Sequence, residues 1–505
     1  MCISCHKLPP RRSLVPVHES PTPRSDTPQA RTLRELRESG HTYRTVKAEI
    51  RENLLARLRA GEPRFPGIVG FDETVLPHLE RALLAGHDLV LLGERGQGKT
   101  RLIRTITGLL DEWTPVVEGC EINDHPYAPA CVRCRRLASE LGDDLPIAWK
   151  GREDRYGEKL ATPDTSVGDL IGDVDPIKIA EGRTLGDPET VHYGLVPRTN
   201  RGVFSVNELP DLAERIQVSL LNVLEERDVQ VRGYNLRLPL DLLLIASANP
   251  EDYTNRGRII TPLKDRFGAE IRTHYPQTLE DELALIRQEA ELNWKIQTTD
   301  DTVGADATGL SAELPDHIVE ILARFTRLVR ESTAVDSRSG VSARFAIAAA
   351  ETAAASAVRR AAITGEERPV TRVCDLPGVV PTLRGKVEFE VSEEGREVEV
   401  LAHLLRRATA ETFRGTLGGM DLSVLLDKFS EGAQIESGEL ITATDLLQRI
   451  GPVNGLAKIM SAVGMGEGDE SPGHAAAALE FALEGLYLLR RLSKDEVDGG
   501  AVYRT

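Results

Sequence analysis

The chain has 505 residues, which at about 150 residues per domain corresponds to roughly three domains. Hydrophobic residues make up 41% and charged residues 28%, which excludes a wholly disordered or fibrous chain. The formal net charge of -17 opposes binding to nucleic-acid phosphates or anionic lipids, and no apolar run approaches the roughly 18 residues of a membrane span. We therefore expect a cytoplasmic protein with no membrane span and no strong nucleic-acid signal.

The N-terminal end has two parts of different composition. Residues 1–30 are rich in proline and polar residues, a composition typical of a disordered tail. Residues 31–64 carry leucine, isoleucine and valine at broadly helical spacing, and the pattern ends at Gly61 and Pro63. This spacing predicts an N-terminal helical segment before the main body begins near residue 65.

Residues 65–276 alternate short apolar strands with longer helical stretches. This alternation predicts an α/β fold, in which a parallel sheet is flanked by helices on both faces. The clearest predicted strands are Asp88–Leu92, Gly202–Val206 and Leu242–Ala248.

The chain becomes predominantly helical after Pro276. Residues 277–365 are predicted to form an all-α domain, because good helix formers recur there with few strand signals. Residues 366–505 are predicted to form a mostly helical C-terminal region, with a mobile end from Gly499 onward. The predicted helices of the all-α domain are Leu279–Leu292, Asp316–Arg330 and Ser342–Ile363.

A phosphate-binding motif follows the first predicted strand and precedes a predicted helix at Leu102–Leu110. Its residues match G-x-x-x-x-G-K-[ST] and are Gly93, Glu94, Arg95, Gly96, Gln97, Gly98, Lys99 and Thr100. In this pattern backbone N–H groups surround phosphate oxygens, the lysine reaches the outer phosphates and the hydroxyl ligates Mg²⁺. The motif therefore predicts a site for ATP and Mg²⁺.

A second strand ends in polar residues that suit the same chemistry. The apolar run from Gly202 ends in Asn207 and Glu208, and a phosphate-binding loop needs a carboxylate strand nearby. Glu208 is the predicted general base, and Asn207 is predicted to contact Mg²⁺ directly or through water. The alternative is that both residues merely cap the following helix.

With these motifs, residues 65–365 resemble the AAA+ ATPases, and within them the magnesium chelatase subunit I and MoxR group. The resemblance rests on the phosphate-binding motif as Walker A, on Asn207 and Glu208 as a variant Walker B, and on Ser247–Pro250. It implies a P-loop AAA+ core followed by an all-α lid. Asn207 stands where the family has aspartate, so the metal shell loses a negative charge and hydrolysis could be slowed.

The resemblance also implies roles for three further residues. Asn249 matches the sensor 1 position, where its amide would orient the attacking water or contact the γ-phosphate. Arg344 matches the sensor 2 position at the start of a lid helix. The alternatives are a turn-forming Asn-Pro pair for Asn249 and an ordinary helical arginine for Arg344.

Arg266 lies in a segment that looks like the family's arginine-finger segment, and would then act on the nucleotide of a neighbouring subunit. Such an arginine stabilises charge that develops on the transferred phosphoryl group. The alternative is a surface arginine paired with Asp265. Arg256 and Arg258 are the next candidates for the finger.

Two segments are similar to insertions of the same group. Val229–Leu238 alternates about a glycine and resembles the presensor hairpin, and Asp169–Asn200 resembles the insertion in the second helix. In the family's rings these elements face the pore or a partner.

Three cysteines lie close together in residues 120–134. Cys120, Cys131 and Cys134 have the spacing C-x10-C-x2-C, with His125 between them as a candidate fourth ligand. This set could bind a structural Zn²⁺ ion. Ordinary packing and thiol redox chemistry are the alternatives.

The resemblance implies an ATP hydrolase that assembles with itself into a hexameric ring and remodels or metal-loads a partner. A separate partner with a von Willebrand A domain is implied, because its D-x-S-x-S signature is not found here. One alternative is an ATP-gated scaffold with little turnover. The other is a sigma-factor-dependent transcription activator, although its characteristic loop and helix-turn-helix are not found in this sequence. Magnesium chelatase activity itself is not implied, because subunit I supplies only the ATPase of that enzyme and the cysteine loop departs from the group.

Overall fold

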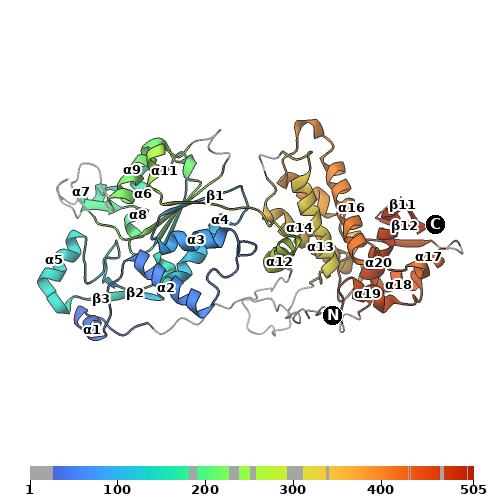
Figure 1. Cartoon of the computed structure of the whole chain (residues 1–505), viewed down its shortest axis with the longest axis horizontal. Coiled ribbons are helices and arrows are strands. Elements are labelled where there is room, and N and C mark those ends of the chain that lie inside the picture. The colour runs from blue at the N-terminus through green and yellow to red at the C-terminus, as the bar shows by residue number, and fades with distance from the viewer. Residues whose placement is uncertain are drawn as a thin grey trace, which may run out of the picture.

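The computed structural model has an α/β part and a mainly helical part that lie next to each other along the long axis of the molecule (Figure 1). No helix within the described residues has the length and apolar character to cross a bilayer. The described residues are 27–180, 190–226, 238–250, 258–292, 311–336, 340–429, 432, 434–466, 471–497 and 499–504.

The predicted N-terminal tail lies mostly outside the described residues. Its last residues lie against the α/β part, where the indole N–H of Trp149 donates to the carbonyl of Ala30 at 2.8 Å. The predicted helical segment at residues 31–64 forms two helices, α1 (Leu33–Glu38) and α2 (Val46–Ala60).

A five-stranded parallel sheet forms the centre of the α/β part, with strand order β4-β7-β8-β1-β9. Its strands are β1 (Leu89–Leu92), β4 (Tyr156–Leu160), β7 (Val203–Asn207), β8 (Leu243–Ala248) and β9 (Ala269–Arg272). The three central strands β1, β7 and β8 are buried along their whole length, which confirms the predicted parallel sheet covered on both faces.

The side chains of β1 alternate between two hydrophobic cores. Leu89 and Leu91 pack with α2 and the helices that follow it, while Val90 and Leu92 pack on the opposite face of the sheet. The other helices of this part are α3 (Val75–Leu84), α4 (Lys99–Thr105), α5 (Val132–Leu141), α6 (Val167–Leu170), α7 (Pro176–Ala180), α8 (Leu195–Arg198), α9 (Glu214–Glu225) and α11 (Thr261–Arg266).

Two short antiparallel pairs stand apart from the main sheet. They are formed by β2 (Trp113–Val117) with β3 (Ile147–Gly151), and by β5 (Gly172–Val174) with β6 (Val191–Tyr193). The second pair lies in the segment that resembles the helix-2 insertion. Residues 181–189 of that segment and residues 229–237 of the predicted presensor hairpin lie outside the described residues.

The predicted lid helices are confirmed within one or a few residues. They are α12 (Leu279–Glu289), α13 (Asp316–Glu331) and α14 (Ala343–Thr364). The later helices are α15 (Val379–Leu383), α16 (Glu397–Thr416), α17 (Ser423–Asp427), α18 (Ala443–Ile450), α19 (Leu456–Ala462) and α20 (Pro472–Leu488). One hydrophobic cluster runs through both sets of helices, from Ile286 to Tyr503.

The C-terminal end forms a strand, so the prediction of a mobile end from Gly499 is wrong. Strand β12 (Gly500–Arg504) lies between β10 (Ile435–Gly438) and β11 (Ser493–Val497) in an antiparallel sheet. Its alternate residues Ala501 and Tyr503 are buried, and the Tyr503 hydroxyl donates to Glu484 at 2.5 Å. Burial of this face holds the end of the chain in place.

Candidate nucleotide site and cysteine cluster

The phosphate-binding motif forms the loop between β1 and α4. Gly96 and Gly98 have φ angles of 72° and 75°, a left-handed conformation that favours glycine. Gly98 is the N-cap residue of α4, and Lys99 begins the helix. The first amide groups of α4 therefore face the loop at the carboxyl end of β1, as the motif predicts.

The ammonium group of Lys99 is buried inside this loop, where the side chain is only 7% exposed. It donates to the carbonyls of Gly93 and Glu94, at 2.9 Å for Glu94, and to Asn249 Oδ1 at 2.6 Å. The end of β8 is thus tied to the phosphate loop by a charge-assisted hydrogen bond.

Asn249 continues this series to the end of β7. Its Nδ2 donates to Glu208 Oε2 at 2.6 Å, so Lys99, Asn249 and Glu208 form one hydrogen-bonded series. Parallel strands bring their carboxyl ends to one edge of the sheet, which explains why residues distant in the sequence meet there. Glu208 has a φ angle of 55°, and such backbone strain in a residue other than glycine is concentrated at functional sites.

Asn207 lies beside this series, but its polar atoms have other partners. Its Oδ1 accepts hydrogen bonds from the hydroxyls of Ser205 and Ser247, both at 3.3 Å. Its Nδ2 donates to Glu158 Oε1 at 2.6 Å, and the other Glu158 oxygen accepts from Arg104 at 2.9 Å. Glu158 is not predictable from the sequence, because only the pairing of β4 with β7 brings it next to Asn207.

The start of the lid helix α14 contacts the phosphate loop. Ala343 N donates to the Gly96 carbonyl at 3.4 Å, and a side chain at Gly96 would collide with Ser342. The exposed Arg344 lies in the first turn of α14, which Ser342 caps by accepting from Arg344 N at 2.9 Å. The predicted sensor 2 residue therefore lies on the lid element nearest the loop, and its contact with a phosphate stays a prediction.

Arg266 lies at the end of α11, with its guanidinium at the surface and 30% exposed. It pairs with Glu225 at the end of α9 at 2.6 Å and donates to the Pro262 carbonyl at 2.8 Å. Within its own chain Arg266 therefore pairs with Glu225, and its role in a neighbouring subunit stays a prediction. Of the two other candidate fingers, Arg256 lies outside the described residues.

An open cavity of about 400 Å³ adjoins the phosphate loop. One wall is held by a hydrogen bond from the Thr273 hydroxyl to Gln97 Oε1 at 2.8 Å. The cavity joins the loop to the ends of β8 and β9, and its lining residues are Leu92, Gly93, Glu94, Gln97, Pro250, Lys264, Glu270, Arg272 and Thr273.

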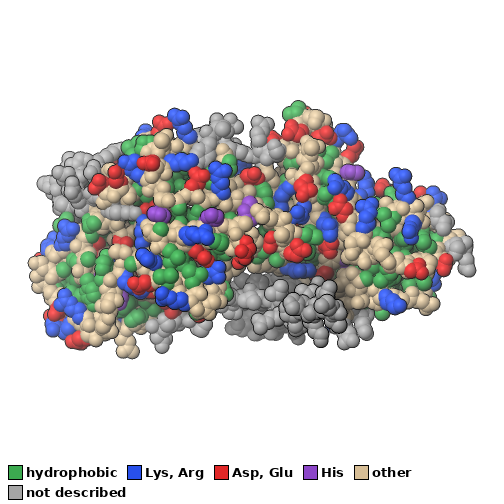
Figure 2. All heavy atoms as spheres, in the orientation of Figure 1, with side chains coloured by type: hydrophobic (Ala, Val, Ile, Leu, Met, Phe, Trp, Pro, Cys, Tyr) green, Lys and Arg blue, Asp and Glu red, His purple; other side chains and the backbone are tan. Residues whose placement is uncertain are grey.

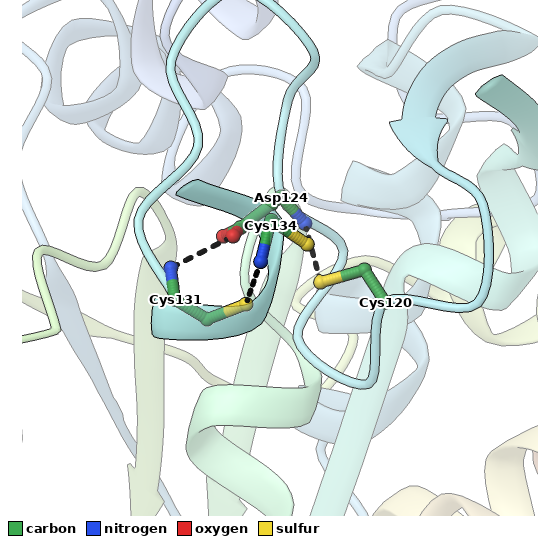
Figure 3. A group of neighbouring side chains, drawn as sticks. All are labelled: Cys120, Asp124, Cys131 and Cys134. Carbon is green, nitrogen blue, oxygen red and sulfur yellow. Dashed lines mark hydrogen bonds between the residues drawn. The ribbon is translucent and has the colours of Figure 1, made fainter. Parts of the chain in front are cut away.

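The predicted cysteine cluster is present, but its fourth member is Asp124 (Figure 3). The sulfur atoms of Cys120, Cys131 and Cys134 and a carboxylate oxygen of Asp124 all lie within 4.8 Å of one another. Hydrogen bonding from Cys131 and Cys134 lowers the pKa of the Cys120 thiol below its usual value.

The prediction of His125 as the fourth ligand is wrong. The His125 ring lies among aromatic side chains, stacked on His41 with centroids 5.6 Å apart and edge-on to Tyr127. Its Nδ1 accepts the backbone N–H of Tyr127 at 3.0 Å, and burial lowers the pKa of His125 to about 3. Packing of the ring against His41 keeps the imidazole out of the cluster.

The visible face of the molecule carries basic and acidic side chains interspersed with one another (Figure 2). This mixture is in keeping with the acidic overall charge of the sequence.

Residues 183–266 match a family model described as the Sigma-54 interaction domain. The chain is 30% identical over 215 residues to the magnesium-chelatase subunit ChlI of Guillardia theta, which covers 41% of this chain and 56% of that protein. It is 30% identical over 241 residues to the magnesium-chelatase 38 kDa subunit of Acidiphilium rubrum, covering 44% of this chain and 62% of the relative. The chain thus spans less than two thirds of each relative.

A solved complex between the subunits BchI and BchD of magnesium chelatase has a chain that is similar at 23% identity, with a TM-score of 0.34. The similarity covers 67% of this chain and 98% of that chain. The chain is thus similar in sequence to subunits of magnesium chelatase, and its structure places a phosphate-binding loop at the end of a strand in a parallel five-stranded sheet.

Proposed function

We propose that the chain binds ATP with Mg²⁺ and hydrolyses it between the subunits of a hexameric ring, in order to remodel or metal-load a partner protein. The observation that carries the proposal is the hydrogen-bonded series of Lys99, Asn249 and Glu208. The amide of Asn249 joins Lys99, which would contact the outer phosphates, to Glu208, which would activate the attacking water.

Each group has a distinct part in the proposed reaction. Lys99 would exchange its loop carbonyls for phosphate oxygens, and Thr100 would ligate Mg²⁺ together with Asn207, directly or through water. Glu208 would accept the proton of the attacking water, which Asn249 orients. Arg344 of the lid and Arg266 of a neighbouring subunit would stabilise the charge on the transferred phosphoryl group.

The proposed partner is a separate protein with a von Willebrand A domain. Support comes from the names of the relatives, which are subunits of magnesium chelatase and therefore work within a larger enzyme. Because the chain spans less than two thirds of these relatives, chelatase chemistry is not part of the proposal. The further proposed cofactor is a structural Zn²⁺ ion in the cysteine cluster, separate from the nucleotide.

The function is tested by the Glu208→Gln variant in an ATPase assay, with and without a candidate partner. We expect it to bind ATP normally but to lose at least about 10²-fold in turnover, because the general base is removed while the phosphate contacts remain. Glu411→Gln is the matched control, since Glu411 lies on α16 and pairs with Arg407. Wild-type protein without turnover under either condition would overturn the motor proposal.

Such a result would favour the second candidate, an ATP-gated scaffold that turns over little. The observation behind it is Asn207, whose carbonyl oxygen already accepts two hydroxyl hydrogen bonds and whose amide is held by Glu158. A neutral and fully bonded side chain is a weak magnesium ligand. Affinity capture with ATP-bound Glu208→Gln protein would then recover a stable partner in the absence of hydrolysis.

A further inference from the structure

The cysteine cluster lies outside the nucleotide site, on the loop that connects β2 to α5. Figure 3 shows the side chains of Cys120, Asp124, Cys131 and Cys134 converging on one another from this loop and from the first turn of α5. Their ligand atoms all lie within 4.8 Å of each other. Cys374 lies elsewhere, next to the C-terminal helix α20, through its hydrogen bond to Glu480.

Asp124 provides an independent indication that this cluster binds a cation. The side chain is 1% exposed, and its Oδ2 accepts the backbone N–H groups of Ala130 at 3.0 Å and Cys131 at 2.8 Å. Among the described residues, its buried Oδ1 finds no hydrogen-bond partner. An unsatisfied buried carboxylate oxygen is costly, and a cation bound beside it would remove that cost.

Backbone N–H groups point at two of the sulfur atoms. Asp124 N donates to Cys120 Sγ at 3.3 Å, and Cys134 N donates to Cys131 Sγ at 3.3 Å. The guanidinium of Arg133 also lies 4.0 Å from Cys134 Sγ. These donors stabilise negative charge on sulfur, and hydrogen bonds of this kind orient and tune the ligands of metal sites.

We propose that Cys120, Asp124, Cys131 and Cys134 bind a structural Zn²⁺ ion. In tetrahedral coordination with Zn–S bonds of about 2.3 Å, the sulfur atoms lie about 3.8 Å apart, so the cluster needs only a small contraction. Thiolates select zinc over magnesium or calcium, and four protein ligands make a closed, non-catalytic site. Each thiol that coordinates the metal releases its proton to solvent.

The ion would hold in place the loop that carries the cysteine cluster, and this loop contacts the residues that precede β7. Asn123, next to the ligand Asp124, donates to the carbonyl of Arg198 at 2.6 Å, and Asn200 donates back to the carbonyl of Ile122 at 2.9 Å. The chain passes from Asn200 directly into β7, which ends beside Glu208. Zinc therefore acts on the nucleotide site only by holding this segment in place.

The test is the metal content of the full chain, purified without chelators and measured by mass spectrometry. We expect about one zinc per chain, together with three thiols that become reactive only when the metal is removed. Cobalt added to metal-free wild-type protein should give the absorption bands of tetrahedral thiolate coordination. Substoichiometric zinc without these cobalt bands, or a disulfide within the cluster, would overturn the proposal.

Variants identify the ligands. Asp124→Asn keeps an oxygen for the two backbone N–H groups but removes the charge, and we expect zinc affinity to fall by more than about tenfold. His125→Asn and Cys374→Ala are the matched controls and should retain zinc. Loss of zinc from His125→Asn but not from Asp124→Asn would contradict the proposed ligand set. The readout is metal content, so the result does not depend on whether the chain hydrolyses ATP.

Discussion

At the scale of single residues, Asn249 shows why a particular side chain is required at a particular position. Its carbonyl oxygen accepts from Lys99 while its amide nitrogen donates to Glu208, each at 2.6 Å. A side-chain amide offers an acceptor and a donor from one planar group. An aspartate at this position would lack the donor and would place a second negative charge against Glu208. The amide therefore bridges the ammonium group of Lys99 and the carboxylate of Glu208 through two hydrogen bonds.

Asn207 gives the residue-scale prediction. In Asn207→Asp the donor to Glu158 becomes a carboxylate at a separation of about 2.6 Å, so two negative charges face each other. In urea unfolding without Mg²⁺, we expect the free energy of unfolding of this variant to be about 1 to 3 kcal/mol lower than that of the wild type. We also expect Mg²⁺ to stabilise this variant more than the wild type, because a cation relieves the repulsion.

The control for Asn207→Asp is the double variant with Glu158→Gln, in which the amide and carboxylate exchange places. It should recover most of the lost stability, since one donor and one acceptor again face each other. An Asn207→Asp protein as stable as the wild type in the absence of Mg²⁺ would contradict this account of the contact.

At the scale of elements, the sequence predicted what depends on local periodicity and missed what depends on pairing across the fold. Strands β1, β7 and β8 and helices α12, α13 and α14 lie close to their predicted positions, because long apolar runs and helical spacing are local signals. Strand β12 was missed because only Ala501 and Tyr503 mark its buried face.

The same distinction applies to the candidate sites. The phosphate loop, Asn249 and Glu208 were found because each ends a recognisable strand. Glu158 was missed because its partner Asn207 lies across the pairing of β4 with β7, which spacing does not reveal. Asp124 was missed in favour of His125 because the sequence suggests ligand types but not the direction in which neighbouring side chains point.

Helix α13 gives the element-scale prediction, through its buried His317. Burial lowers the pKa of this imidazole to about 3, and the ring lies 4.9 Å from that of Phe481 on α20. Below the unfolded pKa of about 6.5 the unfolded chain binds a proton that the folded chain does not, so stability falls as the pH falls toward 3. This histidine should therefore contribute a loss of about 1.4 kcal/mol between pH 7.5 and pH 5.5.

The measurement compares urea unfolding of wild-type and His317→Leu protein at these two pH values. The variant should lose about 1.4 kcal/mol less than the wild type on acidification, whatever its stability at pH 7.5. His403→Leu serves as a control for substitution of a histidine on another helix, α16. Equal pH dependence of the wild type and His317→Leu would show that His317 is not the group that titrates.

At the scale of the whole molecule, the proposed reaction requires two copies of the chain. Lys99 and Glu208 lie in one site, whereas Arg266 lies at the surface and pairs with Glu225. The ion pair is partly exposed, and such pairs contribute about 0 to 1 kcal/mol, so the arginine can exchange Glu225 for a phosphate of a neighbouring subunit. If Arg266 acts across an interface, a substitution of Arg266 and a substitution in the nucleotide site can be placed on different chains of one assembly.

Mixing two inactive variants tests this arrangement. Lys99→Ala removes the proposed phosphate contact, and Arg266→Ala removes the proposed finger. An arginine finger is worth about 10³ or more in rate, so each variant alone should have little ATPase activity. In an equal mixture, about a quarter of the interfaces combine an intact Lys99 site with an intact Arg266 from the neighbour. We therefore expect activity to return toward about a quarter of the wild-type rate.

The control mixture combines Lys99→Ala with Glu208→Gln. Both residues serve the same half of the interface, joined through Asn249, so no subunit in this mixture has an intact site and activity should stay low. Recovery in the first mixture and not in the second requires that the arginine acts on its neighbour's nucleotide. If neither mixture recovers while mixed rings form, Arg266 serves its own chain or has no part in the reaction, and the interface model is wrong.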